Sequence, residues 1–169
     1  MRTVGARLAA AVVAGVLWAG SAAAQVTVTF VTPEHYTDAA NRFGSGLSLR
    51  VTLAEMRRLF EELGGQVLRP GQSLAIEVLD IDLAGYERPG VNVPYGLRVV
   101  DDVGAPRFRL RYALRDGRRT LQSGEETITE ISFLLRYQRA ANSRTFGYER
   151  ELLRDWFRSR FARREPPRP

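Results

Sequence analysis

Two aspartates near the middle of the chain are the side chains best placed for chemistry. Asp80 and Asp82 stand two positions apart in the segment Val-Leu-Asp-Ile-Asp-Leu, and in a β-strand that spacing puts both on one face. Such a pair suits a hard cation or an acid–base mechanism. A calcium site needs about six to eight oxygen ligands, however. We therefore expect the two aspartates to bond loop amides or arginines, and we predict no metal site and no cofactor.

A second acidic pair, Glu125 and Glu126, follows Gly124. Adjacent strand residues face opposite sides of a sheet, so these two carboxylates do not form one catalytic pair. Asp80, Asp82 and Glu126 together define an alternative hypothesis, a carboxylate- or metal-dependent hydrolase of the cell envelope.

The usual catalytic residues are scarce. The chain has no cysteine and a single histidine, His35, which stands between Glu34 and Tyr36 in a predicted loop. We find no G-x-S-x-G nucleophile turn and no glycine-rich phosphate loop followed by lysine. These absences favour a non-catalytic binding or interaction domain, but they leave enzymatic activity open and the catalytic residues unassigned.

Three arginines alternate with apolar residues in the segment 107–114. This period places Arg107, Arg109 and Arg111 on the solvent side of a strand. Guanidinium groups suit carboxylates and phosphates. We therefore assign Arg109 and Arg111 as a ligand-binding site for an acidic envelope protein, glycan or lipid head group. The alternative is an ordinary solvated face. It would be rich in arginine only because this chain contains 25 arginines and no lysine.

The segment 71–85 predicts the central strand. Its apolar positions alternate through Val78 and then change phase, so that Leu79 and Ile81 become apolar while Asp80 does not. A phase change within one strand indicates a β-bulge. Other segments also predict strands. They lie at 26–30, at 97–100 and at 107–114.

The clearest hairpin signal is Asp116-Gly117. Closing a two-residue turn there pairs Arg115 with Arg118 and, eight residues further from the turn, Arg107 with Glu126. We also expect Glu77 to neutralise another arginine of the row if its strand is adjacent.

Capping boxes predict two helices. Thr52 and Glu55 would begin a helix that ends at Gly64-Gly65, and Thr127 and Glu130 would begin another. The second helix would bury the apolar residues Ile131, Leu134 and Leu135. A final helix carries a broad apolar stripe over residues 148–161. The fold class is thus α+β, in the order β-α-β-(β)-β-β-α-α, with one mostly antiparallel sheet and helices packed on one face.

The first 24 residues predict a signal peptide. Arg2 and Arg7 flank an apolar run, and Ala22-Ala23-Ala24 fits the cleavage rule. Of 169 residues, a 24-residue leader leaves 145, which suits a single domain spanning residues 25–162 with a disordered tail at 163–169. The net charge of +6 falls to +4 without the two leader arginines. We predict a periplasmic or secreted protein with no nucleic-acid partner and no transmembrane span after cleavage.

Several short motifs together resemble a known family. They are Val-Thr-Phe-Val-x-Pro at 28–33, Pro-Gly-Gln at 70–72, Glu-Val-Leu-Asp-Ile-Asp-Leu-Ala-Gly at 77–85, Ser-Gly-Glu-Glu at 123–126 and Tyr-Glu-x-x-x-Leu-x-x-Trp-Phe at 148–157. In this order, over nearly all of residues 26–162, the chain resembles the small exported bacterial family called domain of unknown function 3016. The resemblance implies an exported single-domain protein and supplies no activity.

Overall fold

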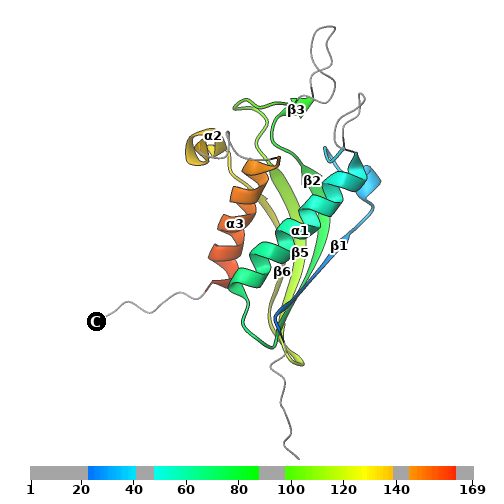
Figure 1. Ribbon diagram of the computed structural model, residues 1–169, viewed down its shortest axis with the longest axis vertical. Helices are drawn as coiled ribbons and strands as arrows, with labels where there is room; N and C mark the ends of the chain where they lie inside the picture. The colour runs from blue at the N-terminus through cyan, green and yellow to red at the C-terminus, as the bar shows by residue number, and fades with distance from the viewer. Residues whose placement is uncertain (1–22, 41–47, 88–97, 139–144, 163–169) are drawn as a thin grey trace, which may run out of the picture.

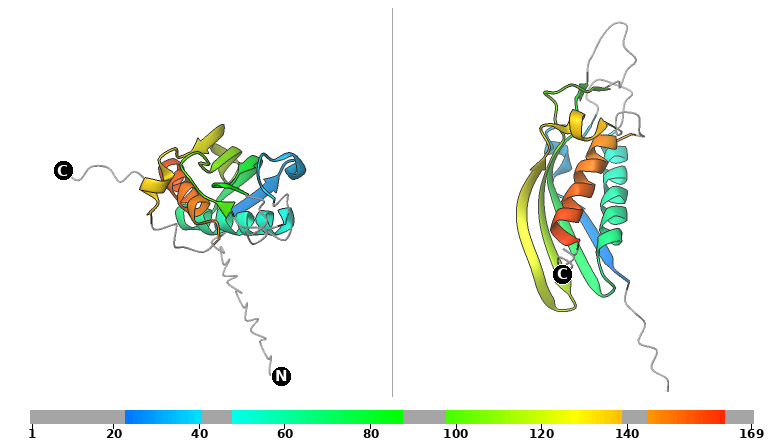
Figure 2. Two further views of the ribbon diagram at one scale, coloured as in Figure 1. Left: turned by 90° about the horizontal axis from the view of Figure 1, so that it is seen from above. Right: turned by 90° about the vertical axis from the view of Figure 1, so that its left-hand side faces the viewer.

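The protein is a sheet with helices on one side. The computed structural model describes residues 23–40, 48–87, 98–138 and 145–162. Four strands form one sheet in the order β1-β2-β5-β6, and the long helices α1 and α3 pack against one of its faces (Figure 1). The sheet curves around these helices, and its other face carries no described helix (Figure 2). The predicted α+β class, with helices on one face, is confirmed.

Some predictions fall outside these residues. The leader predicted for residues 1–24 lies almost wholly outside the described residues, and the tail predicted for 163–169 lies wholly outside them. Within the described residues, no helix is long and apolar enough to cross a bilayer.

The first strand and the central strand run parallel. Strand β1 (Gln25–Phe30) pairs with β2 (Gln72–Asp82) from Gln25–Ser73 to Phe30–Val78. Parallel neighbours need a crossover connection. Here the connection contains the short 3-10 helix η1 (Pro33–His35) and helix α1 (Leu49–Val67). The two remaining neighbour pairs of this sheet are antiparallel.

The predicted bulge in the central strand is confirmed. The register between β2 and β5 (Arg107–Asp116) shifts between Val78 and Asp80, so Leu79 is the extra residue. Val78 on one side of the bulge and Ile81 on the other are both fully buried. The bulge therefore keeps the apolar set inside although the sequence changes phase.

The hairpin register differs from the prediction. Strand β6 (Arg119–Thr129) pairs with β5 through Asp116–Arg119, so the turn is Gly117-Arg118, one position later than expected. A second bulge follows, because Arg115 pairs with Thr120 while Leu114 pairs with Gln122. Gly117 has a φ of +54°, which glycine adopts without strain. Placing the glycine first in the turn thus moves every cross-strand partner that the sequence predicted.

Two short strands form a separate ribbon. The short strand predicted near 97–100 is present as β4 (Arg98–Val99), and it pairs with β3 (Tyr86–Glu87). Gly85 precedes the ribbon with a φ of +71°, and a β-carbon there would lie 2.1 Å from the carbonyl oxygen of Val99. Only glycine allows this close approach.

Both boundaries predicted for the first helix are wrong. The N-cap of helix α1 is Ser48, four residues before the predicted cap Thr52, and its side chain accepts a hydrogen bond from the amide of Val51 (3.4 Å). Thr52 is instead a buried helical residue. The helix also continues through Gly64, whose missing side chain lets it pack against Val26 and Phe157.

The helix predicted from Thr127 is also wrong, because β6 extends to Thr129. Helix α2 (Phe133–Arg136) has a single turn. Phe133 and Tyr137 are buried there, and of the three predicted residues only Leu134 packs partly against the core. Ile131 and Leu135 are 78% and 76% exposed. Residues 127–129 pair with β5 instead of starting a helix, because the cross-strand pairing of the hairpin continues to Thr129.

Helix α3 (Gly147–Phe161) carries the predicted apolar stripe into the core. Phe60 of α1, Phe108 of β5 and Phe157 of α3 meet edge to face, with ring centroids 6.1 and 6.2 Å apart. These rings join both helices to the centre of the sheet, so the outer face is held on a packed support.

Candidate binding surface

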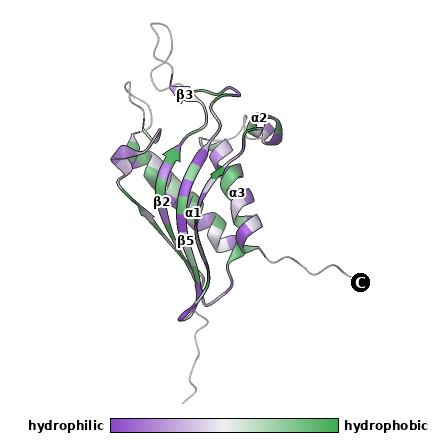
Figure 3. Ribbon diagram, turned by 180° about the vertical axis from the view of Figure 1, so that it is seen from behind, coloured by the Kyte–Doolittle hydropathy of each residue, from purple (hydrophilic) through white to green (hydrophobic). Residues whose placement is uncertain are grey.

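The arginine row lies on the uncovered face of the sheet, as predicted. Arg107, Arg109 and Arg111 of β5 are exposed, while the residues between them are buried against the helices. Figure 3, turned by 180° from the view of Figure 1, shows this face towards the reader, with β2 and β5 in front of the helices. We call it the outer face.

The arginines are bound by carboxylates from both neighbouring strands. Arg109 donates from Nε (2.9 Å) and Nη2 (2.6 Å) to Oε1 of Glu125. Arg111 donates from Nε (3.3 Å) and Nη2 (3.0 Å) to the other oxygen of Glu125. On its other side, Arg111 donates from Nη1 to Glu77 (2.7 Å), which confirms that Glu77 neutralises an arginine of the row. We call these four side chains the arginine–carboxylate network.

The network shifts the acidities of its members. Hydrogen bonds from Arg109 and then Arg111 lower the pKa of Glu125 below its usual value. Hydrogen bonds to Glu125 and then Glu77 raise the pKa of Arg111. The hydrogen bonds therefore favour the charged forms of Glu125 and Arg111.

The predicted pair of Arg107 with Glu126 is wrong. Arg107 donates to Asp82 instead (3.0 Å). The later hairpin turn and the bulge after it together place Thr129 opposite Arg107. Asp82 belongs to β2 and Glu126 to β6, so both the residue and the strand predicted for Arg107 were wrong.

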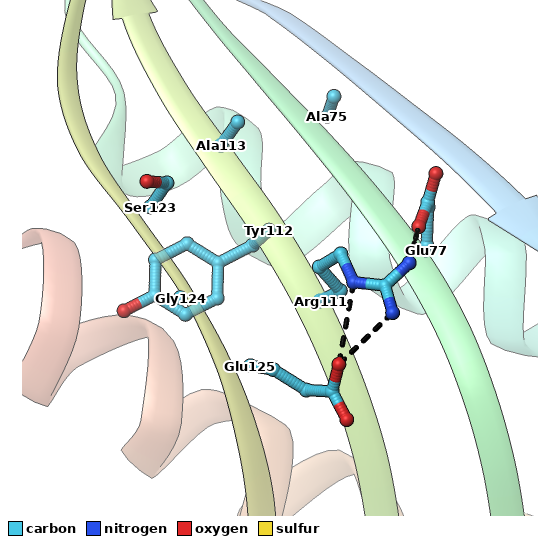
Figure 4. A pocket seen from close by; sticks show the side chains of 8 residues that line it. All are labelled: Ala75, Glu77, Arg111, Tyr112, Ala113, Ser123, Gly124 and Glu125. Carbon is cyan, nitrogen blue, oxygen red and sulfur yellow. Dashed lines mark hydrogen bonds and ion pairs between the residues drawn. The ribbon is translucent and has the colours of Figure 1, made fainter.

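A shallow hollow of about 400 Å³ lies beside the network. Ala75, Ala113 and Ser123 are cross-strand partners on β2, β5 and β6, and they line the hollow together with Arg111. The next set of partners along the strands is Glu77, Arg111 and Glu125. Figure 4 shows the Arg111 guanidinium between the two glutamates, with the small side chains beyond it. Small residues in one row and long charged residues in the next create the hollow.

The two aspartates of β2 are bound by protein groups, as expected. Asp80 accepts hydrogen bonds from the amide and the hydroxyl of Thr37, each at 2.7 Å, and Asp82 accepts one from Arg107. Burial raises the pKa of Asp82 in spite of the nearby Arg107. Within the described residues, no group of three acidic, histidine or cysteine side chains could hold a metal ion.

The residues of the hydrolase hypothesis do not come together. Glu126 lies on the helix-bearing side, where it accepts hydrogen bonds from Tyr112 (2.8 Å), Trp156 (3.3 Å) and Arg160 (3.0 Å). It lines a separate cleft of about 370 Å³ between β6, α2 and α3. Asp82 pairs with Arg107 on the outer face, so the sheet separates it from Glu126.

Glu149 is a buried carboxyl group that the sequence did not predict. Its side chain is buried, and Oε1 accepts a hydrogen bond from the amide of Ala84 (2.8 Å). Burial raises the pKa of Glu149, and this effect exceeds the opposing hydrogen bond. Nearby, Arg98 binds Asp38 (2.6 Å). A glutamate in the first turn of a helix is an ordinary N-terminal signal, so nothing in the sequence marked it as buried.

His35 ends the exposed 3-10 helix η1 and contributes to neither the network nor the hollow.

Comparison with known proteins gives a single family. A family model described as "Protein of unknown function (DUF3016)" matches residues 24–159. This match covers every strand described above and all but the last two residues of α3. It confirms the resemblance noted in the sequence. No curated protein and no solved structure matches the chain.

Proposed function

The chain belongs to the family of proteins of unknown function DUF3016, and from the geometry of its outer face we propose that it is a non-catalytic, exported binding domain. The observation that carries this proposal is the arginine–carboxylate network on a sheet face that no described helix covers. We place the docking site on this face, at Arg109 and Arg111.

Stability alone gives little reason for this network. Ion pairs between exposed side chains contribute little to the free energy of unfolding, and the side chains of Arg109 and Arg111 are 58% and 55% exposed. The network does fix four long side chains in one arrangement. Side chains that are already ordered lose less conformational entropy when a partner binds, and arginine is enriched at the energetic centres of protein interfaces.

The hydrogen bonds of Arg109 indicate the chemistry of the partner. Its Nε and Nη2 groups both donate to Glu125, and no described residue accepts a hydrogen bond from its Nη1 group. A carboxylate of the partner can bind at Nη1 without displacing Glu125. We therefore propose an acidic protein of the cell envelope as the partner. The signal peptide predicted from the sequence supports export of the domain to the same compartment.

The test is capture of partners from an envelope extract on the immobilised mature chain. The Arg109→Ser/Arg111→Ser double variant removes the docking arginines. The Arg115→Ser/Arg119→Ser variant removes the same charge from exposed residues near the hairpin tip. We expect wild type and the tip variant to retain the same acidic protein, identified by mass spectrometry, and the docking variant to lose it. Raising the salt concentration should weaken capture.

Equal capture of that protein by a folded docking variant would rule out this site. Capture of a glycan or of anionic lipid vesicles in place of a protein would correct the partner class. Circular dichroism of each variant serves as the control for folding.

A further inference from the structure

The hollow beside the network is positioned for a ligand group that the network itself does not bind. The inference that follows rests on the proposed function, since it concerns the partner that docks on the outer face. The floor of the hollow is made of two methyl groups, from Ala75 and Ala113, and one hydroxyl group, from Ser123. The Arg111 side chain lines the same hollow.

The hydrogen bonds of Arg111 limit what its guanidinium can offer. Nε and Nη2 donate to Glu125 on one side, and Nη1 donates to Glu77 on the other. Three of the five N–H groups of the guanidinium are thus engaged, and the two that remain lie in the same plane. A ligand that stacks on the flat face of the group displaces none of these hydrogen bonds. The two carboxylates also repel an anion that approaches Arg111 along this plane, so Arg111 differs from Arg109 in its function.

A flat guanidinium face, a methyl floor and a hydroxyl group together suit an aromatic ring. Arginine stacks on aromatic faces, and a ring above methyl groups buries apolar area on both sides. The Ser123 hydroxyl can bond the phenol of tyrosine or the N–H of tryptophan. An aliphatic side chain would gain nothing from the guanidinium, and an acidic one would face Glu77 and Glu125.

We infer that the hollow binds an aromatic side chain of the partner protein, tyrosine or tryptophan, stacked on the guanidinium of Arg111 above Ala75 and Ala113. In this arrangement Arg109 binds an acidic group of the partner, and Arg111 with the hollow binds the aromatic group next to it.

The test is a nuclear magnetic resonance titration of the ¹⁵N-labelled mature chain with N-acetyl-tyrosinamide and N-acetyl-tryptophanamide. N-acetyl-leucinamide is the control ligand. We expect saturable shifts of the amides of Ala75, Ala113 and Ser123 with both aromatic ligands and no saturation with the leucine ligand.

Two variants test the geometry. Ala75→Ile fills the hollow with a side chain that suits an exposed strand position, and it should abolish the saturable shifts. Thr127→Ile adds the same side chain to an exposed position of β6 that does not line the hollow, and it should leave them unchanged. Arg111→Lys keeps the charge but loses the flat face, and it should weaken binding by about two- to fivefold.

Equal shifts with the leucine ligand, or unchanged binding to a folded Ala75→Ile variant, would overturn the inference. The proposed function is tested separately. If Ala75→Ile still captures the acidic protein while Arg109→Ser/Arg111→Ser does not, the docking site stands and the aromatic contact is excluded. If neither variant loses the protein, the docking site itself is wrong.

Discussion

Glu149 is a carboxyl group whose environment opposes its ionisation. It is 3% exposed in the first turn of α3, and burial raises its pKa. Burying a carboxyl group costs free energy unless the group is hydrogen-bonded. Here the bond to the Ala84 amide ties the first turn of α3 to the end of β2.

The raised pKa of Glu149 predicts the pH dependence of stability. The folded state holds the proton more tightly than the unfolded state, so the stabilisation is complete below the unfolded pKa and is lost as the pH rises through the folded pKa. For one proton the slope is at most about 1.4 kcal/mol per pH unit. We expect Glu149→Gln to remove this fall, because glutamine keeps an acceptor for Ala84 and does not ionise.

Urea unfolding of wild type and Glu149→Gln between about pH 5 and pH 8 measures the effect. Glu61→Gln, an exposed change on α1, is the control and should follow the wild type. A Glu149→Gln variant that loses stability in parallel with wild type as the pH rises would show that another group causes the fall.

At the scale of the elements, two adjacent glycines of α1 have opposite roles. A β-carbon on Gly64 would lie 2.7 Å from the Val26 side chain and 3.2 Å from the Phe157 ring, while one on Gly65 would meet nothing within 4 Å. The first glycine thus sets the distance of α1 from β1 and α3. The second only weakens the helix.

This contrast predicts effects of opposite sign. Gly65→Ala should stabilise the protein by about 0.5–1 kcal/mol, from helix propensity alone. Gly64→Ala has the same gain but overpacks the contact, which costs about 1–3 kcal/mol, so it should be neutral or destabilising. Thermal or urea unfolding of the two variants decides the matter. Equal stabilisation by both alanines would mean that α1 can move away from β1 at no cost.

The strands were predictable from the sequence because alternation depends only on which face is buried. That pattern alone predicted that the side chains of Arg109 and Arg111 lie on the exposed face of the sheet. Their partners did not, because a one-position change in the turn at Gly117 moves every pair in the hairpin.

Helix boundaries failed for a related reason. The signals at Thr52 and Thr127 are local, whereas burial of Thr52 and the extension of β6 depend on the whole fold. The outer-face hollow likewise arises only when Ala75, Ala113 and Ser123 meet across three strands.

At the scale of the whole molecule, the sheet begins where the mature chain is predicted to begin. Gln25 is the first residue of β1 and pairs with Ser73, and it directly follows the predicted cleavage site. Cleavage at the predicted site would therefore leave the whole of β1 in the mature chain.

We expect intact-mass analysis of the protein from its native host to give an N-terminus at Gln25, with or without cyclisation of the glutamine. The reason is the small-residue cleavage motif that ends at Ala24. A purified protein that keeps Trp18 would contradict cleavage and the assignment to the periplasm or the medium. Expression of the chain without residues 1–24 is the control, and it should give the same fold by circular dichroism.

The parallel pairing of β1 with β2 has a consequence for the time course of synthesis. An antiparallel hairpin can close as soon as its second strand is made, but Gln25 must wait for Ser73. At about 5–20 residues per second, this wait lasts roughly 2–10 s. During that interval the Val-Thr-Val-Thr-Phe strand has no partner from its own fold. The newborn chain therefore exposes the edges of this strand before the residues that pair with it have been made.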